Sequence, residues 1–173
     1  MKLRKSWHSV VVVAAVAASI AFGGCNTSGC LENRNSLPLA GFYSSSTLEK
    51  IQLDSLAVGG VGQASDSLLN TPPLAISQVY LPLRSTTSST SFYIRYLNKD
   101  LDFPELYDTI TFDYSSEPRF VSEECGAMYY YRISRMAYTR HLVDSVAITD
   151  SLITNTDIER IHIYFRTANP ETP

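Results

Sequence analysis

Three cysteines carry the most definite chemistry in this chain of 173 residues. Cys25 follows Ala21-Phe22-Gly23-Gly24 at the end of an apolar run that begins at Val10, and basic residues precede the run. A bacterial lipoprotein signal has this form, in which the peptide is cut before a cysteine whose sulfur then carries lipid. Cys25 is therefore the predicted lipidation site. The alternative is an uncleaved membrane helix, but a run of about 13 residues is short for a bilayer that needs roughly 20.

Cys30 and Cys125 remain as an even pair once Cys25 is lipidated. Thiols oxidise in the compartments that exported proteins reach, so we expect a disulfide between Cys30 and Cys125. Two free buried thiols are the alternative. The bridge would close a loop of about 95 residues, for which the chain-entropy estimate is about 4–5 kcal/mol. Cys30 also lies so close to Cys25 that the domain would stay within roughly 17 Å of its lipid.

Three consecutive tyrosines, Tyr129, Tyr130 and Tyr131, are the candidate ligand or partner surface. Successive side chains of a strand point to opposite faces, so at least one of the three faces away from the core. Exposed tyrosines stack on sugar rings or anchor a partner protein. Sugar-binding platforms usually rely on tryptophan, and the only one, Trp7, lies in the signal.

No catalytic residue, metal site or cofactor is expected from the remaining polar residues. His141 and His162 have no histidine or cysteine at metal-ligand spacing. Residues 98–102 have the acidic spacing that opens a calcium loop, but Phe103 stands where the loop needs glycine and Thr109 where it needs glutamate. A solvated loop is the prediction there. The G-x-S-x-G motif of serine hydrolases is absent from the sequence.

The net charge of the chain argues against nucleic acid as a partner. Residues 1–24 hold three of the 14 basic residues and none of the 17 acidic ones, so their removal leaves a net charge of −6. An acidic domain without a basic cluster is a poor nucleic-acid binder, and anionic headgroups repel it. Membrane association would then depend on the lipid at Cys25.

The elements that must position these residues are short strands. No apolar stripe of helical period longer than two turns follows the signal, whereas alternating runs recur between turn residues. This pattern predicts an all-β domain, a two-layer antiparallel β-sandwich of immunoglobulin-like type, with an up-and-down β-barrel as the alternative. A hairpin is predicted from two of the runs, and a turn is predicted at 115–118. The expected strands are 37–43, 48–58, 75–83, 91–97, 108–114, 126–136, 141–149 and 158–166, with 75–83 and 91–97 forming the hairpin.

The predicted domain organisation is simple. Residues 1–24 are the signal peptide, whose helix is cleaved off, and residues 25–29 are a short lipid tether. Residues 30–168 form a single β domain, and residues 169–173 are a flexible tail.

Two segments of the chain resemble a known family. Asn35-Ser36-Leu37-Pro38-Leu39-Ala40-Gly41-Phe42-Tyr43 follows the second cysteine, and Pro118-Arg119-Phe120-Val121-Ser122-Glu123-Glu124-Cys125-Gly126 contains the third. Together they resemble an uncharacterised lipoprotein family of the Bacteroidetes cell envelope, known as a domain of unknown function. The resemblance implies an envelope location and a β-rich domain, and it brings no catalytic residues.

The expected function is therefore that of a membrane-anchored, non-enzymatic envelope lipoprotein that binds or supports another outer-membrane protein. The alternative is a carbohydrate- or small-ligand-binding β-sandwich module. No acidic run follows Cys25, which favours the periplasmic face of the outer membrane. The sequence fixes neither the partner nor the oligomeric state.

Overall fold

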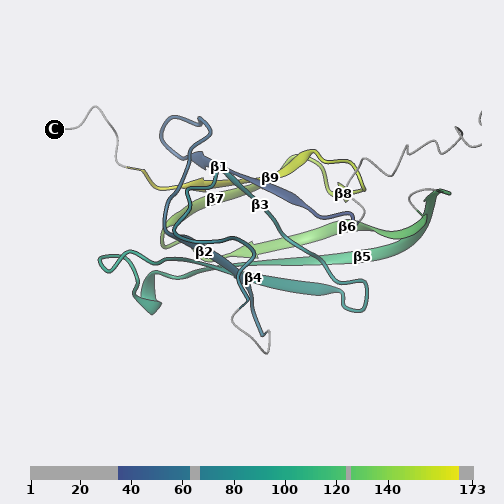
Figure 1. Ribbon diagram of the computed structural model, residues 1–173, viewed down its shortest axis with the longest axis horizontal. Helices are drawn as coiled ribbons and strands as arrows, with labels where there is room; N and C mark the ends of the chain where they lie inside the picture. The colour runs from purple at the N-terminus through teal and green to yellow at the C-terminus, as the bar shows by residue number, and fades with distance from the viewer. Residues whose placement is uncertain (1–34, 63–66, 124–125, 168–173) are drawn as a thin grey trace, which may run out of the picture. The chain divides into compact units, whose positions relative to one another are not determined.

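The structure is a computed structural model that describes residues 35–62, 67–123 and 126–167. The signal, the tether, all three cysteines and the tail 169–173 lie outside these residues. Within them no helix is long and apolar enough to cross a membrane. The elements in chain order are β1 (Leu39–Ser44), β2 (Leu56–Gly60), β3 (Gln78–Tyr80), β4 (Ser89–Tyr96), η1 (Pro104–Leu106), β5 (Asp108–Ser122), β6 (Gly126–Tyr138), β7 (Val143–Ile148), β8 (Leu152–Ile153) and β9 (Glu159–Phe165) (Figure 1).

The strands form two sheets that pack face to face. One sheet has the order β3-β1-β9-β7 and the other the order β2-β4-β5-β6-β8. Figure 1 shows them as two layers, with β1, β3, β7 and β9 above and β2, β4, β5 and β6 below. The predicted all-β sandwich is confirmed. One pair departs from the antiparallel rule, because β1 and β9 run parallel, with Phe42 beside Ile163.

The core forms where alternating apolar side chains of the two sheets meet. In β9 the side chains of Ile161, Ile163 and Phe165 are buried, as the period-two pattern predicts. Phe165 packs edge-to-face on Phe42 of the same sheet, at 5.5 Å between ring centroids. It also packs on Tyr96 of the opposite sheet, at 6.5 Å. Burial of such aromatic side chains is the main favourable term in holding the two layers together.

The predicted hairpin of 75–83 with 91–97 is wrong. β3 pairs with β1 in the upper sheet, whereas β4 pairs with β2 and β5 in the lower sheet. The segment between them crosses from one sheet to the other. Period-two alternation indicates a strand with one buried face, but it does not show to which sheet the strand belongs. The pattern therefore fits a hairpin and also fits two strands in different sheets.

The predicted turn at 115–118 is also wrong, because β5 continues through it to Ser122. β4 pairs with β5 only as far as Asp113, and the N–H of Tyr114 still donates to the carbonyl of Ser88, so beyond Tyr114 no described strand pairs with that edge of β5. Pro118, which lacks an N–H, is tolerated on such an edge, and it lies opposite Tyr129 of β6. The longest hairpin of the described chain is therefore β5–β6.

Candidate functional site

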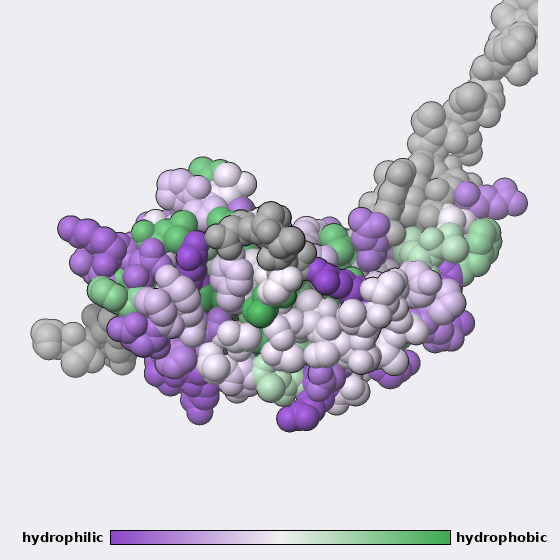
Figure 2. Space-filling model, turned by 90° about the horizontal axis from the view of Figure 1, so that it is seen from below, coloured by the Kyte–Doolittle hydropathy of each residue, from purple (hydrophilic) through white to green (hydrophobic). Residues whose placement is uncertain are grey.

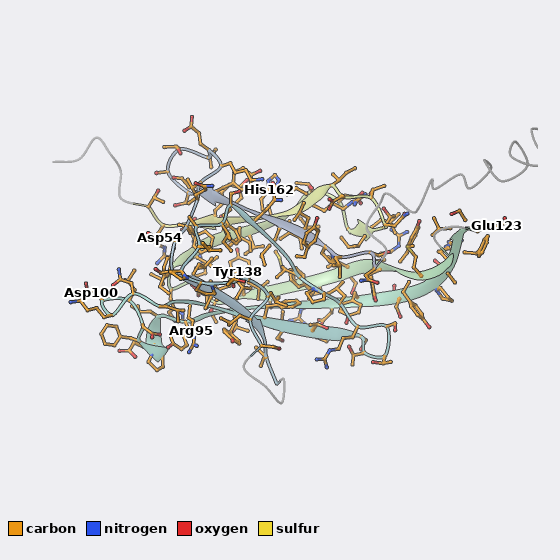
Figure 3. All side chains as sticks on the ribbon, viewed as in Figure 1. Asp54, Arg95, Asp100, Glu123, Tyr138 and His162 are labelled. Carbon is orange, nitrogen blue, oxygen red and sulfur yellow. The ribbon has the colours of Figure 1, made fainter. Side chains whose placement is uncertain are left out.

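The β5–β6 hairpin extends past the rest of its sheet. β8 pairs with β6 only at Tyr131 and Arg132. Residues 117–122 and 126–130 thus form a two-stranded ribbon, here called the arm, which curves away at the right of Figure 1. Glu123 lies at its far end in Figure 3.

Aromatic side chains of the arm are exposed. Phe120 is 71% exposed and Tyr129 is 43% exposed. Phe120 lies opposite Ala127, and Pro118 lies opposite Tyr129, so all four share one face of the ribbon. In Figure 2 hydrophobic side chains reach the surface at the right-hand end of the molecule, where the arm lies. An exposed apolar ribbon face of this kind is typical of an interaction surface.

The three candidate tyrosines have three different environments. Tyr131 is buried, packs edge-to-face on Tyr114 at 5.5 Å, and donates from its hydroxyl to the carbonyl of Leu83 at 3.3 Å. Burial raises the pKa of Tyr131. Tyr130 is half-buried and its hydroxyl donates to Asn155 at 2.8 Å. Tyr129 is the exposed member, so the triplet does not form one continuous platform.

A hollow of about 570 Å³ lies beside the arm. Its walls are residues 82–86 on one side and residues 127–129 with Tyr131 on the other, and Asn35 and Leu37 also line it. We call it the arm groove. Tyr129 and Tyr131 both line it, and Arg84 is the one charged residue among the described lining residues.

The Arg84 wall of the groove is held in place by side chains of β5. The Tyr114 hydroxyl accepts the N–H of Arg84 and lies 3.0 Å from its carbonyl oxygen as well. The same hydroxyl lies 2.7 Å from the Thr90 hydroxyl. Ser116 donates from its hydroxyl to the carbonyl of Ser85 at 3.2 Å. The irregular segment therefore has its backbone polar groups satisfied by the sheet beneath it.

A second cluster lies on the outer face of the upper sheet, where Figure 3 labels His162. The carboxylate of Glu159 accepts hydrogen bonds from Lys50, at 2.7 Å, and from the hydroxyl of Tyr43. The His162 Nε2 atom is 3.3 Å from the same carboxylate. The rings of Tyr43 and His162 are 4.5 Å apart, and Tyr164 contacts both.

The pKa values in this cluster describe the protonation of the Tyr43–Glu159 hydrogen bond. The hydrogen bond to Glu159, with burial, raises the pKa of Tyr43 to about 12. Burial raises the pKa of Glu159, but the hydrogen bonds from Lys50 and Tyr43 outweigh it and hold that pKa below its usual value. Near neutral pH Tyr43 is thus a protonated donor and Glu159 a charged acceptor.

Sequence reasoning did not find this cluster as a unit. The alternation of β9 does place His162 and Tyr164 on the outward face. The sequence does not show which strand pairs with β9. In the structure Tyr43 lies beside Tyr164 in the parallel pair, and an isolated bridge to Tyr43 brings Lys50 to the cluster. Parallel pairing of the first and last strands leaves no local sequence signal.

The other polar candidates are engaged within the fold. In the loop after β4 the side chain of Asn98 accepts the N–H of Asp100 at 3.1 Å, and Asp102 accepts the hydroxyl of Tyr107 at 2.5 Å. The Nδ1 atom of His141 is 2.9 Å from the carbonyl of Tyr107. Across the described ranges no group of three or more histidine, cysteine or acidic side chains is arranged to hold a metal ion.

The fold and the arm define a β-sandwich domain with a projecting hairpin. A family model described as a family of unknown function, DUF6452, matches residues 55–165, which is more than half of the chain. The chain belongs to this family. The match spans β2 to β9 and includes the arm, whereas β1 precedes it. Searches of curated proteins and of solved structures gave no match.

Proposed function

We propose that this protein is a membrane-anchored, non-enzymatic envelope lipoprotein that binds another outer-membrane protein through its arm. The observation that carries the proposal is the pair Phe120 and Tyr129, exposed on one face of a ribbon that borders the arm groove. Interface hot spots are enriched in aromatic residues of this kind.

Two physical arguments support a protein partner. A two-stranded hairpin with no third strand is marginally stable in water, so covering the apolar face of the arm would stabilise it. The described lining of the groove combines apolar and tyrosine side chains with the polar residues Asn35, Ser85 and Thr86 and the single cation of Arg84. This charge pattern fits a partner segment that presents apolar side chains next to one acidic residue.

Photo-crosslinking in intact cells tests the proposal. A benzophenone amino acid in place of Phe120 should give a crosslink to one envelope protein, and Tyr129→Ser in the same chain should abolish it. The control position is Leu74, which is 64% exposed and lies outside the arm. The same product from position 74, or no product from position 120, would contradict the proposal.

The anchor belongs to the same proposal and rests on the sequence. Lipidation of Cys25 would place the domain at the periplasmic face of the outer membrane, in keeping with a Bacteroidetes envelope lipoprotein. Metabolic labelling with an alkyne palmitate should mark the wild-type protein and leave Cys25→Ser unlabelled. Label retained by Cys25→Ser would place the lipid elsewhere.

We also propose the Cys30–Cys125 disulfide, for which neighbouring residues give support. The hydroxyl of Ser36 donates to the sulfur of Met128 at 3.4 Å, and both residues are buried. Ser36 comes six positions after Cys30 and Met128 three after Cys125. Extended segments of these lengths reach roughly 20 Å and 10 Å, so the two thiols are able to meet. Peptide mapping without reductant should recover one crosslinked peptide pair, whereas alkylation of both thiols without reductant would refute the bridge.

A further inference from the structure

A second hollow, of about 440 Å³, lies between the end of β2, the start of β4 and the segment that leads into β4. We call it the hydroxyl-lined cavity. Arg84 lines both this cavity and the arm groove, but Tyr129 and Tyr131 line only the groove. The walls combine apolar side chains with hydroxyl-bearing ones, including Leu69, Leu83, Phe92, Thr87, Ser89 and Thr90.

We propose that this cavity binds a monosaccharide-sized molecule that carries several hydroxyl groups and one carboxylate, such as a uronic acid. Its volume lies in the range of small-molecule sites, which run from roughly 300 to 1,000 Å³. This binding activity is distinct from docking of a protein at the arm, although Arg84 borders both hollows.

The charge of the cavity selects an anion with a single negative charge. Arg84 is the one charged residue in the described lining. Its guanidinium forms no ion pair with any residue for which the structure gives a position. A guanidinium presents a planar fork that matches a carboxylate in bidentate geometry. One such fork balances one carboxylate, whereas a phosphate dianion would keep uncompensated charge.

The backbone of Arg84 is fixed before any ligand arrives, whereas its side chain is exposed. The Tyr114 hydroxyl contacts both the N–H and the carbonyl of Arg84, each at 3.0 Å. The Tyr131 hydroxyl holds the carbonyl of Leu83, the preceding residue. Tyr114 and Tyr131 are themselves buried in the core. A rim residue held in this way loses little backbone freedom on binding, which favours affinity for a small ligand.

The rest of the wall fits a sugar ring. The hydroxyls of Thr87 and Thr90 contact the Tyr114 hydroxyl. The exposed hydroxyls of Ser67 and Ser89 have no hydrogen-bond partner among the described residues, so they are able to donate to or accept from a ligand hydroxyl. Val61, which is 52% exposed, and the half-buried Leu69 and Pro82 offer an apolar surface for the C–H face of the ring. The Ser/Thr-rich segment before β4 thus links the two sheets and also supplies part of the wall of the proposed sugar site.

Ligand-observed NMR titration of the full-length protein in detergent micelles tests this site, with glucuronate, glucose and acetate as probes. Glucuronate should bind at least tenfold more tightly than glucose, which lacks the carboxylate, or acetate, which lacks the hydroxyls. Arg84→Gln should weaken glucuronate binding about tenfold. The matched control is Arg132→Gln, because Arg132 is exposed on β6 and lines neither hollow. It should leave the affinity unchanged.

The two proposals fail separately. Tyr129→Ser should abolish the crosslink at the arm and leave glucuronate affinity intact, because Tyr129 does not line this cavity. Equal affinities for the three probes, or equal losses in Arg84→Gln and Arg132→Gln, would overturn the sugar-acid site. Ring-proton contacts from bound glucuronate to Val61 or Leu69 would support it without any variant, and contacts to Tyr129 alone would overturn it.

Discussion

The carboxylate of Asp108 accepts the backbone N–H of Val143 at 2.7 Å, although the two residues belong to different sheets. The same carboxylate accepts the N–H groups of Leu142 and His141 and the hydroxyl of Thr139. Asp108 is fully buried at the start of β5. One side chain therefore accepts the backbone N–H groups of the turn through which the chain passes from β6 in the lower sheet to β7 in the upper sheet.

Asp108→Asn should destabilise the domain markedly. The amide keeps the size of the carboxylate but replaces one acceptor oxygen with a donor, so buried N–H groups would lose their partner. A lost hydrogen bond to a buried charged acceptor costs about 1.5–3 kcal/mol. We expect a loss of about 3 kcal/mol in the free energy of unfolding, measured by urea denaturation.

The control for this variant is Asp113→Asn, on the same strand. Asp113 is half-buried and its side chain accepts no hydrogen bond from another described residue. Its replacement should change the free energy of unfolding by no more than about 0.5 kcal/mol. Similar losses in the two variants would mean that charge, and not the local hydrogen bonds, carries the effect.

Tyr114→Phe should loosen the segment that carries Arg84. The variant keeps the buried ring and its contact with Tyr131 but removes the hydroxyl that contacts Arg84 and Thr90. We expect a loss of about 1–2 kcal/mol in the free energy of unfolding. Amide hydrogen exchange at Arg84 should become faster, while Tyr138→Phe should leave that exchange rate unchanged.

The strands of this fold were largely predictable, and their pairing was not. Alternation identified the buried faces of β5 and β9, because Ile110 and Phe112, like Ile161 and Ile163, follow a strict period of two. The same pattern cannot tell a hairpin from a crossover between sheets, which is why β3 and β4 were predicted as partners. Pairing depends on which apolar faces meet in three dimensions, and local sequence does not encode that directly.

Phe120 and Phe112 lie on the same strand and should differ sharply in their contribution to stability. Phe112 is fully buried, whereas Phe120 is 71% exposed. Phe112→Ala should cost about 3–5 kcal/mol in the free energy of unfolding because it leaves a cavity in the core. Phe120→Ala should change it by about 0.5 kcal/mol or less. A large loss from Phe120→Ala would mean that the arm packs against the domain and is not free for a partner.

The candidate sites were predictable only in part. The tyrosine triplet pointed to the strand 126–136, but its separation into a buried, a half-buried and an exposed ring depends on where β8 ends beside β6. The Glu159 cluster required Gly41, which no motif marks. A Cβ atom at position 41 would lie 2.2 Å from the carboxyl carbon of Glu159. The absence of a side chain at Gly41 therefore leaves the space that the carboxylate occupies.

Glu159→Gln should lower the pKa of Tyr43 from about 12 towards its ordinary value near 10, because the charged acceptor of its hydroxyl is lost. The raised pKa means that the protonated phenol stabilises the folded state. That contribution is complete below pH of about 10 and is lost as the pH rises through about 12. Wild-type protein should therefore lose more stability than the variant between these pH values.

Phenol titration by ¹³C NMR measures the effect directly, and Tyr96 is the internal reference. Burial raises the pKa of Tyr96 to about 12 as well. Glu159 does not contribute to this shift, so the titration of Tyr96 should be the same in both proteins. A fall in the pKa of both tyrosines would indicate general loosening of the fold. A fall confined to Tyr43 would show that the Glu159 carboxylate sets its protonation, because Tyr96 is half-buried against the core and packs on Phe165, away from Glu159 in the hydrogen-bond pattern.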